Sequence, residues 1–434
     1  MNINTDKDIG NVLYSWIEDL FPICRSLTGP GVRETLLYFK EILPNLKIHS
    51  VPTGTKAFDW TVPKEWIIKN AYIEDEHGEK VVDFNDNNLH VVGYSESVDR
   101  WLDLNSLEKY LHSLENQPNA IPYITSYYKK SWGFCLTHKQ RESLKNGLYH
   151  VVIDSELKQG VLNYGELIIK GESDEEVLLS TYICHPSMAN NELSGPVVTA
   201  GIVQWLNTLT KRKYTYRIIF IPETIGSIVY LSRHIDYLKT HTVAGFVVNC
   251  IGDERAFSFM PSRSGDSLSD RAALYALNNY IESFDVYSFL DRGSDERQYC
   301  SPGVDLPVCS VMRSKYGTYP EYHTSLDNLE FVTPDGLKGG FFILKEIIKI
   351  LEINDTYQTT CLCEPQLGRH NLYPAVSTKN STNEVYNMMN IFAYSDGESD
   401  LLELSNTIGV DIITLHKMII RYEELGLMKK IIKD

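Results

Sequence analysis

Side chains that could bind a metal ion gather in three short loops, each of which follows an apolar run. The first loop reads "CHPSMANNELSGP" and carries His185 and Asn191. The second, "PET", carries Glu223, and the third, "YGTYPEYHTSLDNL", carries His323. Two histidines and a carboxylate at one edge of a sheet suit a catalytic zinc site, which uses three protein ligands and leaves one position open for water.

Each of these residues also has a plainer interpretation. A lone histidine at the end of a strand is more often a structural residue than a ligand, although the proline and small-residue turn after His185 favour a ligand. Glu223 follows an entirely apolar run, where a carboxylate is costly to bury unless it is paired, metal-bound or protonated. His323 lies among tyrosines, so aromatic packing competes with metal binding. Together the three residues are more informative than any one alone.

The elements that would position these loops alternate between strands and helices from about Gly165 to Leu351. Runs such as "EVLLSTYIC" and "YTYRIIFIP" are short and rich in β-branched residues, whereas "VVTAGIVQWLNTL" is amphipathic at helical spacing. This alternation predicts an α/β fold, a sheet covered by helices on both faces with functional loops at the carboxyl ends of its strands.

The rest of the chain predicts two further domains, and its N-terminal residues belong to the α/β domain. We expect one discontinuous α/β domain over residues 1–55 and 150–355, opening with two helices around "CRSLTGPGVRETL". Residues 56–149 predict a β-rich inserted domain with one helix near Ser106–Leu114. After Asn354 a linker-like stretch runs to about Thr382. Residues 383–434 then predict a winged helix-turn-helix domain, with Ser399 capping one helix and Gly426 ending another.

Composition excludes several classes of protein. The 434 residues carry a net charge of −16, which argues against a general binder of polyanions. The segment from Val385 onward holds five Lys and Arg against eight Asp and Glu, so we expect the winged helix to contact a protein partner or a second copy of the chain and not DNA. The N-terminus lacks the pattern of a secretory signal, and the apolar runs are too short to span a bilayer, which predicts a cytoplasmic protein without membrane insertion.

Several motifs, taken in order, resemble the zinc aminopeptidase superfamily. They are "CHPSMANNELSGP", "FIPETIGS", "RGSDERQY" and "YPEYHTSLDNL". "RSLTGPGVRETL", "FDWTVPKEW" and "YSDGESDLLEL" resemble one bacterial aminopeptidase-like branch, which has an inserted β-rich domain and a C-terminal winged helix and is often associated with polysaccharide biosynthesis. The resemblance covers nearly the whole chain and implies a mixed sheet flanked by helices.

The resemblance also implies roles for particular residues. A histidine at the position of His185 binds one zinc ion, and a histidine at the position of His323 completes that site. The superfamily places a bridging aspartate where this chain has Asn191 and a carboxylate pair where it has Pro222 and Glu223. It places an aspartate for the second zinc where this chain has Asn249 or Cys250. These three departures argue against a two-zinc site and leave one zinc ion as the expected cofactor.

Two arrangements of a one-zinc site stay open. In the first, which we favour, His185, His323 and the Asn191 oxygen are ligands, and Glu223 is the general base that hydrolysis needs. In the second, His185, Glu223 and His323 are ligands, and Asp295 or Glu321 supplies the base, if there is one.

A last group of residues is expected around the substrate. Asp295 would orient a ligand histidine, and Arg297 and Arg313 would suit a carboxylate or phosphate, unless they form a surface salt-bridge cluster. Tyr299 and Tyr322 would help to shape the pocket. The expected function is hydrolysis of an amide bond in a peptide or in an acylamino or sugar-linked small molecule. The alternatives are a binding or scaffold protein on an impaired peptidase fold and, less favoured, a winged-helix regulator that binds DNA.

Overall fold

The computed structural model describes residues 8–372 and 379–431 of the chain. Contacts divide the chain into two compact units. The first unit consists of Met1–Asp270 and Ile281–Leu344, and the second consists of Arg271–Tyr280 and Lys345–Asp434. The three candidate loops all belong to the first unit.

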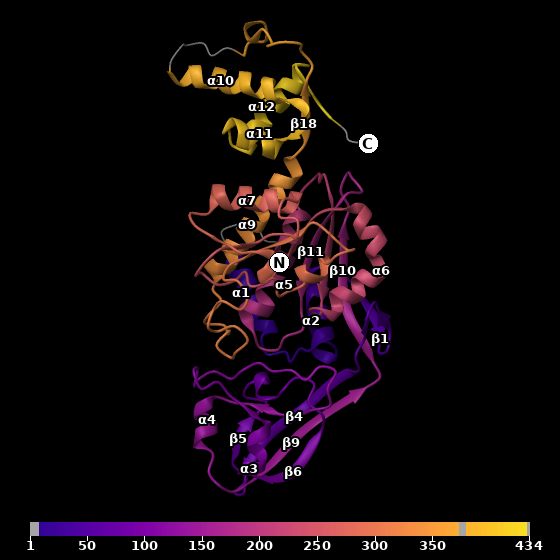
Figure 1. Ribbon diagram of the computed structural model, residues 1–434, viewed down its shortest axis with the longest axis vertical. Coiled ribbons are helices and arrows are strands. Elements are labelled where there is room, and N and C mark those ends of the chain that lie inside the picture. The colour runs from indigo at the N-terminus through magenta and orange to yellow at the C-terminus, as the bar shows by residue number, and fades with distance from the viewer. Residues whose placement is uncertain (1–7, 373–378, 432–434) are drawn as a thin grey trace. The chain divides into compact units, whose positions relative to one another are not determined.

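The centre of the first unit is a mixed sheet of eight strands in the order β1-β10-β12-β11-β13-β16-β14-β15 (Figure 1). Strands β11, β12, β13 and β16 are parallel. The runs "EVLLSTYIC" and "YTYRIIFIP" form β11 and β12, as predicted. The bounds in sheet order are Lys47–Pro52, Val161–Ile169, Thr215–Ile221, Glu176–Tyr182, Thr242–Val247, Val308–Met312, Ser258–Met260 and Asp285–Val286.

Helices cover both faces of this sheet, which confirms the predicted layered α/β fold. Successive residues of a strand point to opposite faces, so Arg217 and Phe220 of β12 mark the two sides. Phe220 stacks on Phe39 at a centroid distance of 4.9 Å, and Arg217 donates to the hydroxyl of Tyr230 at 3.0 Å. Phe39 lies in α2 and Tyr230 in α6, so these helices pack on opposite faces. The main helices of the first unit are α1 Ile9–Leu20, α2 Pro30–Ile42, α5 Ser194–Leu206 and α6 Ile225–His241. Helices α7 Leu268–Tyr280 and α9 Pro334–Ile353 each begin in the first unit and end in the second.

The β-rich insert contains an antiparallel sheet in the order β5-β4-β9-β6. Its strands are Lys80–Asp83, Glu65–Asp75, Leu148–Lys158 and Val98–Asp103. The helix predicted near Ser106–Leu114 is shorter and earlier, since α3 covers Leu104–Leu107 and a single 3-10 turn, Glu108–Tyr110, follows it.

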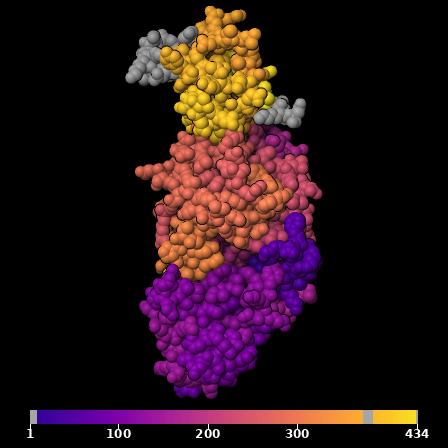
Figure 2. All heavy atoms as spheres, viewed as in Figure 1, coloured from indigo at the N-terminus to yellow at the C-terminus, as the bar shows by residue number. Residues whose placement is uncertain are grey.

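One cluster of buried apolar residues joins the insert to the central sheet. Ile73 and Ile153 of the insert belong to the same cluster as Leu178 and Val247 of the central strands. Figure 2 shows the inserted segment, in purple, as a closely packed body. The insert therefore shares a core with the α/β fold that carries the candidate loops.

The second unit has the winged helix arrangement of three helices and a small sheet in the order β18-β17-β19. Its elements are α10 Lys379–Tyr394, α11 Leu401–Ile408, α12 Ile412–Glu424, β17 Thr356–Thr359, β18 Asp396–Asp400 and β19 Met428–Lys430.

Two local predictions about this unit were wrong. The stretch expected to be a linker contains β17, the middle strand of the sheet; residues 373–378 of that stretch lie outside the described structure. The N-cap of α11 is Asp400 and not Ser399, because the Asp400 carboxylate accepts from the backbone N–H of Glu403 at 3.1 Å. Gly426 does follow α12, at a positive φ of 72° that suits glycine. Over the described ranges, no helix is long and apolar enough to cross a membrane.

Candidate metal centre

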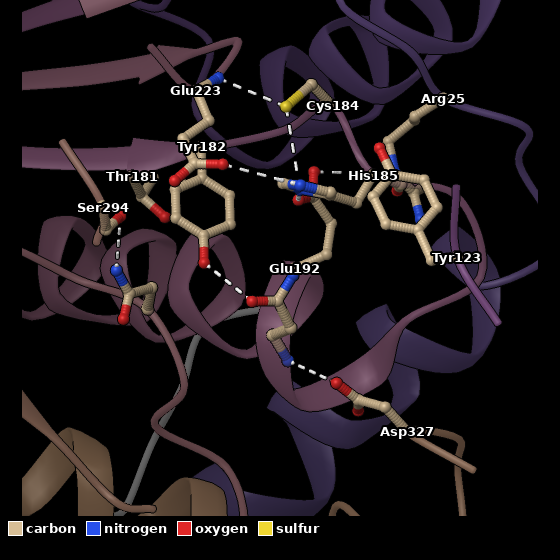
Figure 3. A network of polar contacts seen from close by, with 12 residues as sticks. Arg25, Tyr123, Thr181, Tyr182, Cys184, His185, Glu192, Glu223, Ser294 and Asp327 are labelled. Carbon is tan, nitrogen blue, oxygen red and sulfur yellow. Dashed lines mark hydrogen bonds and ion pairs between the residues drawn. The ribbon is translucent and has the colours of Figure 1, made fainter. Parts of the chain in front are cut away.

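The carboxyl ends of two neighbouring parallel strands bring His185 and Glu223 together. Strand β11 ends at Tyr182 and β12 at Ile221, and these two residues are paired in register. The loops that follow therefore leave the sheet side by side. Nε2 of His185 lies 3.5 Å from Oε2 of Glu223 (Figure 3). The prediction that these strand ends lie at one edge of the sheet is confirmed for this pair.

Glu192 fixes the orientation of the His185 ring. Nδ1 of His185 lies 2.6 Å from Oε2 of Glu192, which is fully buried on a π-helical turn, Ala189–Leu193. Burial opposes a charge on the ring, but Cys184 and Glu192 raise the pKa of His185 well above its ordinary value, so a bound ion would take the place of the Nε2 proton. In the neutral ring, a carboxylate at this distance keeps the proton on Nδ1, so that Nε2 carries the lone pair. Metal-binding histidines are commonly held by a carboxylate in this way.

A buried arginine from the N-terminal segment supports both Glu192 and His185. Arg25 is 1% exposed, and its Nε donates to the backbone oxygen of His185 at 2.9 Å. The same nitrogen lies 3.9 Å from Oε1 of Glu192. The guanidinium also donates to the backbone oxygen of Leu20 at 2.7 Å. Arg25 thus supplies positive charge beside the buried Glu192 and fixes the backbone where His185 begins its loop.

Asn191 lies beside this pair, and its side-chain oxygen already has partners. Oδ1 accepts from the hydroxyl of Tyr182 at 3.0 Å and lies 3.8 Å from the thiol sulfur of Cys250. Nδ2 of Asn191 is buried without a hydrogen-bond partner in the described structure. Asp327 stabilises the turn Ala189–Leu193, because its carboxylate accepts from the backbone N–H groups of Asn190 at 2.6 Å and Asn191 at 2.9 Å. The oxygen that the sequence assigns to a metal is engaged by Tyr182.

His323 approaches His185 from the third loop. The two ring centroids lie 5.5 Å apart, and Tyr322 stacks on His323 at 3.9 Å. Burial, and then repulsion by His185, lower the pKa of His323 to about 3. The ring is therefore neutral near pH 7, the form that binds metals.

The insert holds His323 in place. Residues Pro122 and Thr324 form an isolated antiparallel bridge, and the backbone N–H of Tyr123 donates to the backbone oxygen of His323 at 2.9 Å. The ring of Tyr123 lies 5.2 Å from that of His185 and 5.1 Å from that of His323. A residue of the insert thus contacts both histidines.

Glu223 combines burial with partial access to solvent. Its side chain is 19% exposed, whereas the carboxylates of Glu192, Asp295 and Asp327 belong to fully buried residues. Burial raises the pKa of Glu223, while the charges of His185 and Arg297 oppose that rise. Its backbone N–H donates to the sulfur of Cys184 at 3.2 Å, which ties the second loop to the first.

The distances favour a metal ion at Nε2 of His185. Ligand atoms of Cys184, His185 and Glu192 lie within 4.8 Å of one another. Two atoms bound to one tetrahedral zinc ion at about 2.0–2.2 Å lie about 3.3–3.6 Å apart. The 2.6 Å between Nδ1 and Glu192 is a hydrogen bond and too short for such a pair. The 3.5 Å between Nε2 and Glu223 suits two groups around one ion.

Three residues expected near the substrate lie around Glu223 and His323. Asp295 accepts from the backbone N–H of Thr224 at 2.8 Å, so it supports the Glu223 turn and does not contact a histidine nitrogen. Burial, and then repulsion by Glu223, raise its pKa to about 7. Arg297 donates to the Thr224 hydroxyl at 2.6 Å, and Tyr322 stacks on His323.

Other expected residues lie elsewhere. Tyr299 is fully buried and its hydroxyl pairs with Ser180 of β11 at 2.8 Å, so it is a core residue. Arg313 donates to the backbone oxygen of Ala256 and packs on the Phe257 ring. Glu321, a candidate base, forms a two-point ion pair with Arg255.

Asn249 and three residues not predicted from the sequence complete the site. Asn249 donates to the hydroxyl of Ser294 at 3.0 Å, which leaves no charged group at the position expected to hold a second zinc ion. Glu192, Arg25 and Tyr123 each contact His185, and none of them was predicted to have a role. A buried carboxylate seven residues after His185 was the one local signal that could have identified Glu192.

Comparisons with known proteins agree with this architecture. A family model described as a domain of unknown function, DUF4910, matches residues 14–354, and a winged helix-turn-helix model matches residues 355–430. A protein of Clostridium acetobutylicum, provisionally named for polysaccharide biosynthesis and for an aminopeptidase-like domain, is 44% identical over 411 residues, which are 94% of each chain. The chain belongs to this aminopeptidase-like family.

Solved structures extend the comparison. A crystal structure from Clostridium acetobutylicum, provisionally titled a peptidase, has a TM-score of 0.92 and 43% identity, and the match covers 98% of this chain and 97% of that one. A zinc aminopeptidase from Bacillus subtilis has a TM-score of 0.58 and 11% identity, covering 81% and 96% of the two chains. At that identity the second likeness shows a shared fold, and the family resemblance inferred from the motifs is confirmed.

Proposed function

We propose that this protein is a metal-dependent hydrolase of an amide bond that uses one zinc ion. The observation that carries the proposal is the His185 ring. Glu192 fixes it at Nδ1, and its Nε2 faces Glu223 across 3.5 Å without a normal hydrogen bond. A buried histidine with one nitrogen fixed and the other directed at a carboxylate is arranged as a ligand.

His185 and His323 are the residues that would hold the ion. The centroids of the two rings lie 5.5 Å apart, and Tyr123 of the insert packs against each of them. When bound, zinc supplies a Lewis acid that polarises the amide carbonyl and makes water more acidic. The neutral form of His323, with its pKa of about 3, is available to coordinate over the physiological range.

Glu223 is the group that would take a proton from the attacking water. It is the carboxylate beside His185 that solvent reaches, and its raised pKa brings it closer to the working pH of a general base. In the same position it could instead bind the ion. Glu223→Gln separates these roles: loss of a base abolishes hydrolysis while zinc stays bound, and loss of a ligand releases zinc.

Tyr322 and Arg297 are placed to bind the substrate. Tyr322 stacks on His323, and among the charges that act on its hydroxyl are those of Glu223 and Arg297. This hydroxyl can donate to the carbonyl oxygen of the substrate as negative charge develops there. Arg297 is held through the Thr224 hydroxyl and can pair with an acidic group of the substrate.

We infer that the substrate is a small amide, either a peptide or an acylamino sugar. The name of the Clostridium acetobutylicum relative connects that protein with polysaccharide biosynthesis, which supports the second. Release of amine from N-acetylated amino sugars and from alanyl peptides, measured with zinc added, tests the function. Zinc-loaded protein that cleaves neither class would contradict it.

A second candidate is a binding protein on the same fold. The observation in its favour is the engagement of the Asn191 oxygen by Tyr182, which removes one expected ligand. In that case the pocket binds the same amide without cleaving it, and saturable binding with no turnover would decide for this candidate. The winged helix, whose segment carries more acidic than basic residues, would then join the protein to a partner or to a second copy.

A further inference from the structure

A row of aromatic side chains in the insert leads away from the candidate metal centre. Its first member, Tyr123, contacts both histidines, and its hydroxyl lies 3.0 Å from that of Tyr127. Tyr127 packs edge-on against Tyr94 at 5.1 Å. The next residue in the chain, Tyr128, packs against Trp60 at 5.9 Å. The row therefore runs by direct contact and chain continuity from His185 to Trp60.

The outer end of this row is exposed. Phe58 is 58% exposed, Tyr128 is 55% exposed and Trp60 is 39% exposed. Phe58 lies in the turn between β2, Lys56–Ala57, and β3, Trp60–Thr61, and Trp60 begins β3. The Tyr128 hydroxyl donates to the backbone oxygen of Thr61 at 3.3 Å. Large aromatic rings that face water together mark a binding surface more often than single exposed residues do.

The backbone at this row is strained. Phe58, Tyr94 and Tyr128 have positive φ angles of 52°, 66° and 63°, although none of them is glycine. Bulky residues rarely adopt this conformation, and such outliers cluster at ligand-binding sites, where the position of the side chain matters more than local stability. Two of the strained residues, Tyr94 and Tyr128, belong to the row itself, and Phe58 lies two residues before Trp60 at its outer end.

We propose that Trp60 and Tyr128 form a subsite for a sugar ring of the substrate. This inference rests on the proposed function, which places the scissile amide at His185. The two rings pack edge to face with an interplanar angle of 70°, and the exposed face of one of them can stack on the C–H face of a pyranose while the other ring borders it. Polar groups beside the rings can bind the hydroxyls. Asp59 lies exposed between Phe58 and Trp60, and Lys129 lies exposed next to Tyr128. With an amide at one end and a sugar subsite at the other, the substrate class is an oligosaccharide that contains acylamino sugars.

Binding of tri-N-acetylchitotriose to the full chain, measured by calorimetry in the presence of a chelator, tests the subsite. Without metal the measurement does not depend on hydrolysis. We expect saturable binding that weakens at least tenfold in Trp60→Ala and in Tyr128→Ala. Tyr128→Phe, which keeps the ring, should bind like the parent. Trp101→Ala is the matched control, because Trp101 is 52% exposed in the same insert but stacks on His150.

The outcomes separate the two proposals. Loss of binding in Trp60→Ala and Tyr128→Ala, with Trp101→Ala unchanged, supports the subsite even if no amide is cleaved. Absence of binding, or binding that the Trp60 and Tyr128 variants leave intact, overturns it even if peptides are hydrolysed. Preferential binding of a diphenylalanine probe at Trp60, with no binding of the trisaccharide, would also overturn it and would show a site for aromatic peptides.

Discussion

His185 and His150 each lie between two carboxylates, but their surroundings differ. His150 in the insert lies 2.7 Å from Glu74 through Nδ1 and 2.8 Å from Asp99 through Nε2. Its side chain is 20% exposed, and that of Asp99 is 79% exposed. His185 has one such bond, at 2.6 Å to Glu192, and its side chain is 6% exposed.

This difference shows why a histidine between two carboxylates forms a candidate metal site at His185 and not at His150. Both nitrogens of His150 are occupied by hydrogen bonds to carboxylates, which raise its pKa, so neither nitrogen is open to an ion. The second nitrogen of His185 faces Glu223 at 3.5 Å, a gap that suits an ion. Burial also removes competing water, which makes each electrostatic contact at His185 stronger.

The largest effect is expected from replacing the histidines themselves. His185→Gln should abolish zinc binding and hydrolysis, a greater loss than the ~10–100-fold decrease that follows removal of an outer partner. His150→Gln should leave both unchanged. Zinc affinity from competition with a chromophoric chelator measures this. Equal zinc affinity in the two variants would show that His185 is not a ligand.

The carboxylates that bind Nδ1 of the two histidines should also differ in their effect on zinc affinity. Glu192→Gln keeps the size of the side chain but weakens its hold on Nδ1 of His185, so zinc affinity should fall by roughly 10–100-fold. Glu74→Gln weakens the corresponding contact at His150 and should leave zinc affinity unchanged. Cobalt substitution adds a spectroscopic check, since a displaced His185 ring would alter the d–d absorption bands. Unchanged affinity and spectra in Glu192→Gln would refute the positioning role.

A smaller change, an increase in zinc affinity, is expected from a substitution at Asn191. Asn191→Asp introduces a carboxylate beside the buried Tyr182 hydroxyl, and the added charge should raise zinc affinity by roughly tenfold, or about 1.4 kcal/mol. The matched control is Asn249→Asp alone, which acts at a separate position paired with Ser294. If Asn191→Asp lowers affinity instead, the oxygen of Asn191 does not face the ion.

The smallest effect concerns stability at His150. Hydrogen bonds to Asp99 and then to Glu74 raise the pKa of His150 above its ordinary 6.5. The stabilisation is therefore complete below the ordinary pKa and is lost as pH rises through the raised one. Urea unfolding should show His150→Gln less stable than the parent at about pH 5.5 and equal to it at about pH 9. A difference of the same size at both values would assign the effect to packing against Trp101.

Much of the central fold could be predicted because its strands are short, apolar and β-branched. His185 and Glu223 were also predictable, since each follows such a strand and parallel strands end at one edge of the sheet. Arg25 lies 160 residues from His185, and Tyr123 comes from the insert, so only the folded chain brings them to the site. Tyr299 was assigned to the pocket because of its motif, but α8, Glu296–Tyr299, turns its ring into the core.

The zinc content of the full chain tests most directly whether His185 and His323, beside Glu223, hold one zinc ion. The purified protein is loaded with zinc, freed of excess and analysed by mass spectrometry beside His185→Gln and His150→Gln. The account predicts one zinc per chain in the parent and in His150→Gln, and none in His185→Gln. A parent protein without zinc, or equal zinc in all three, would contradict it.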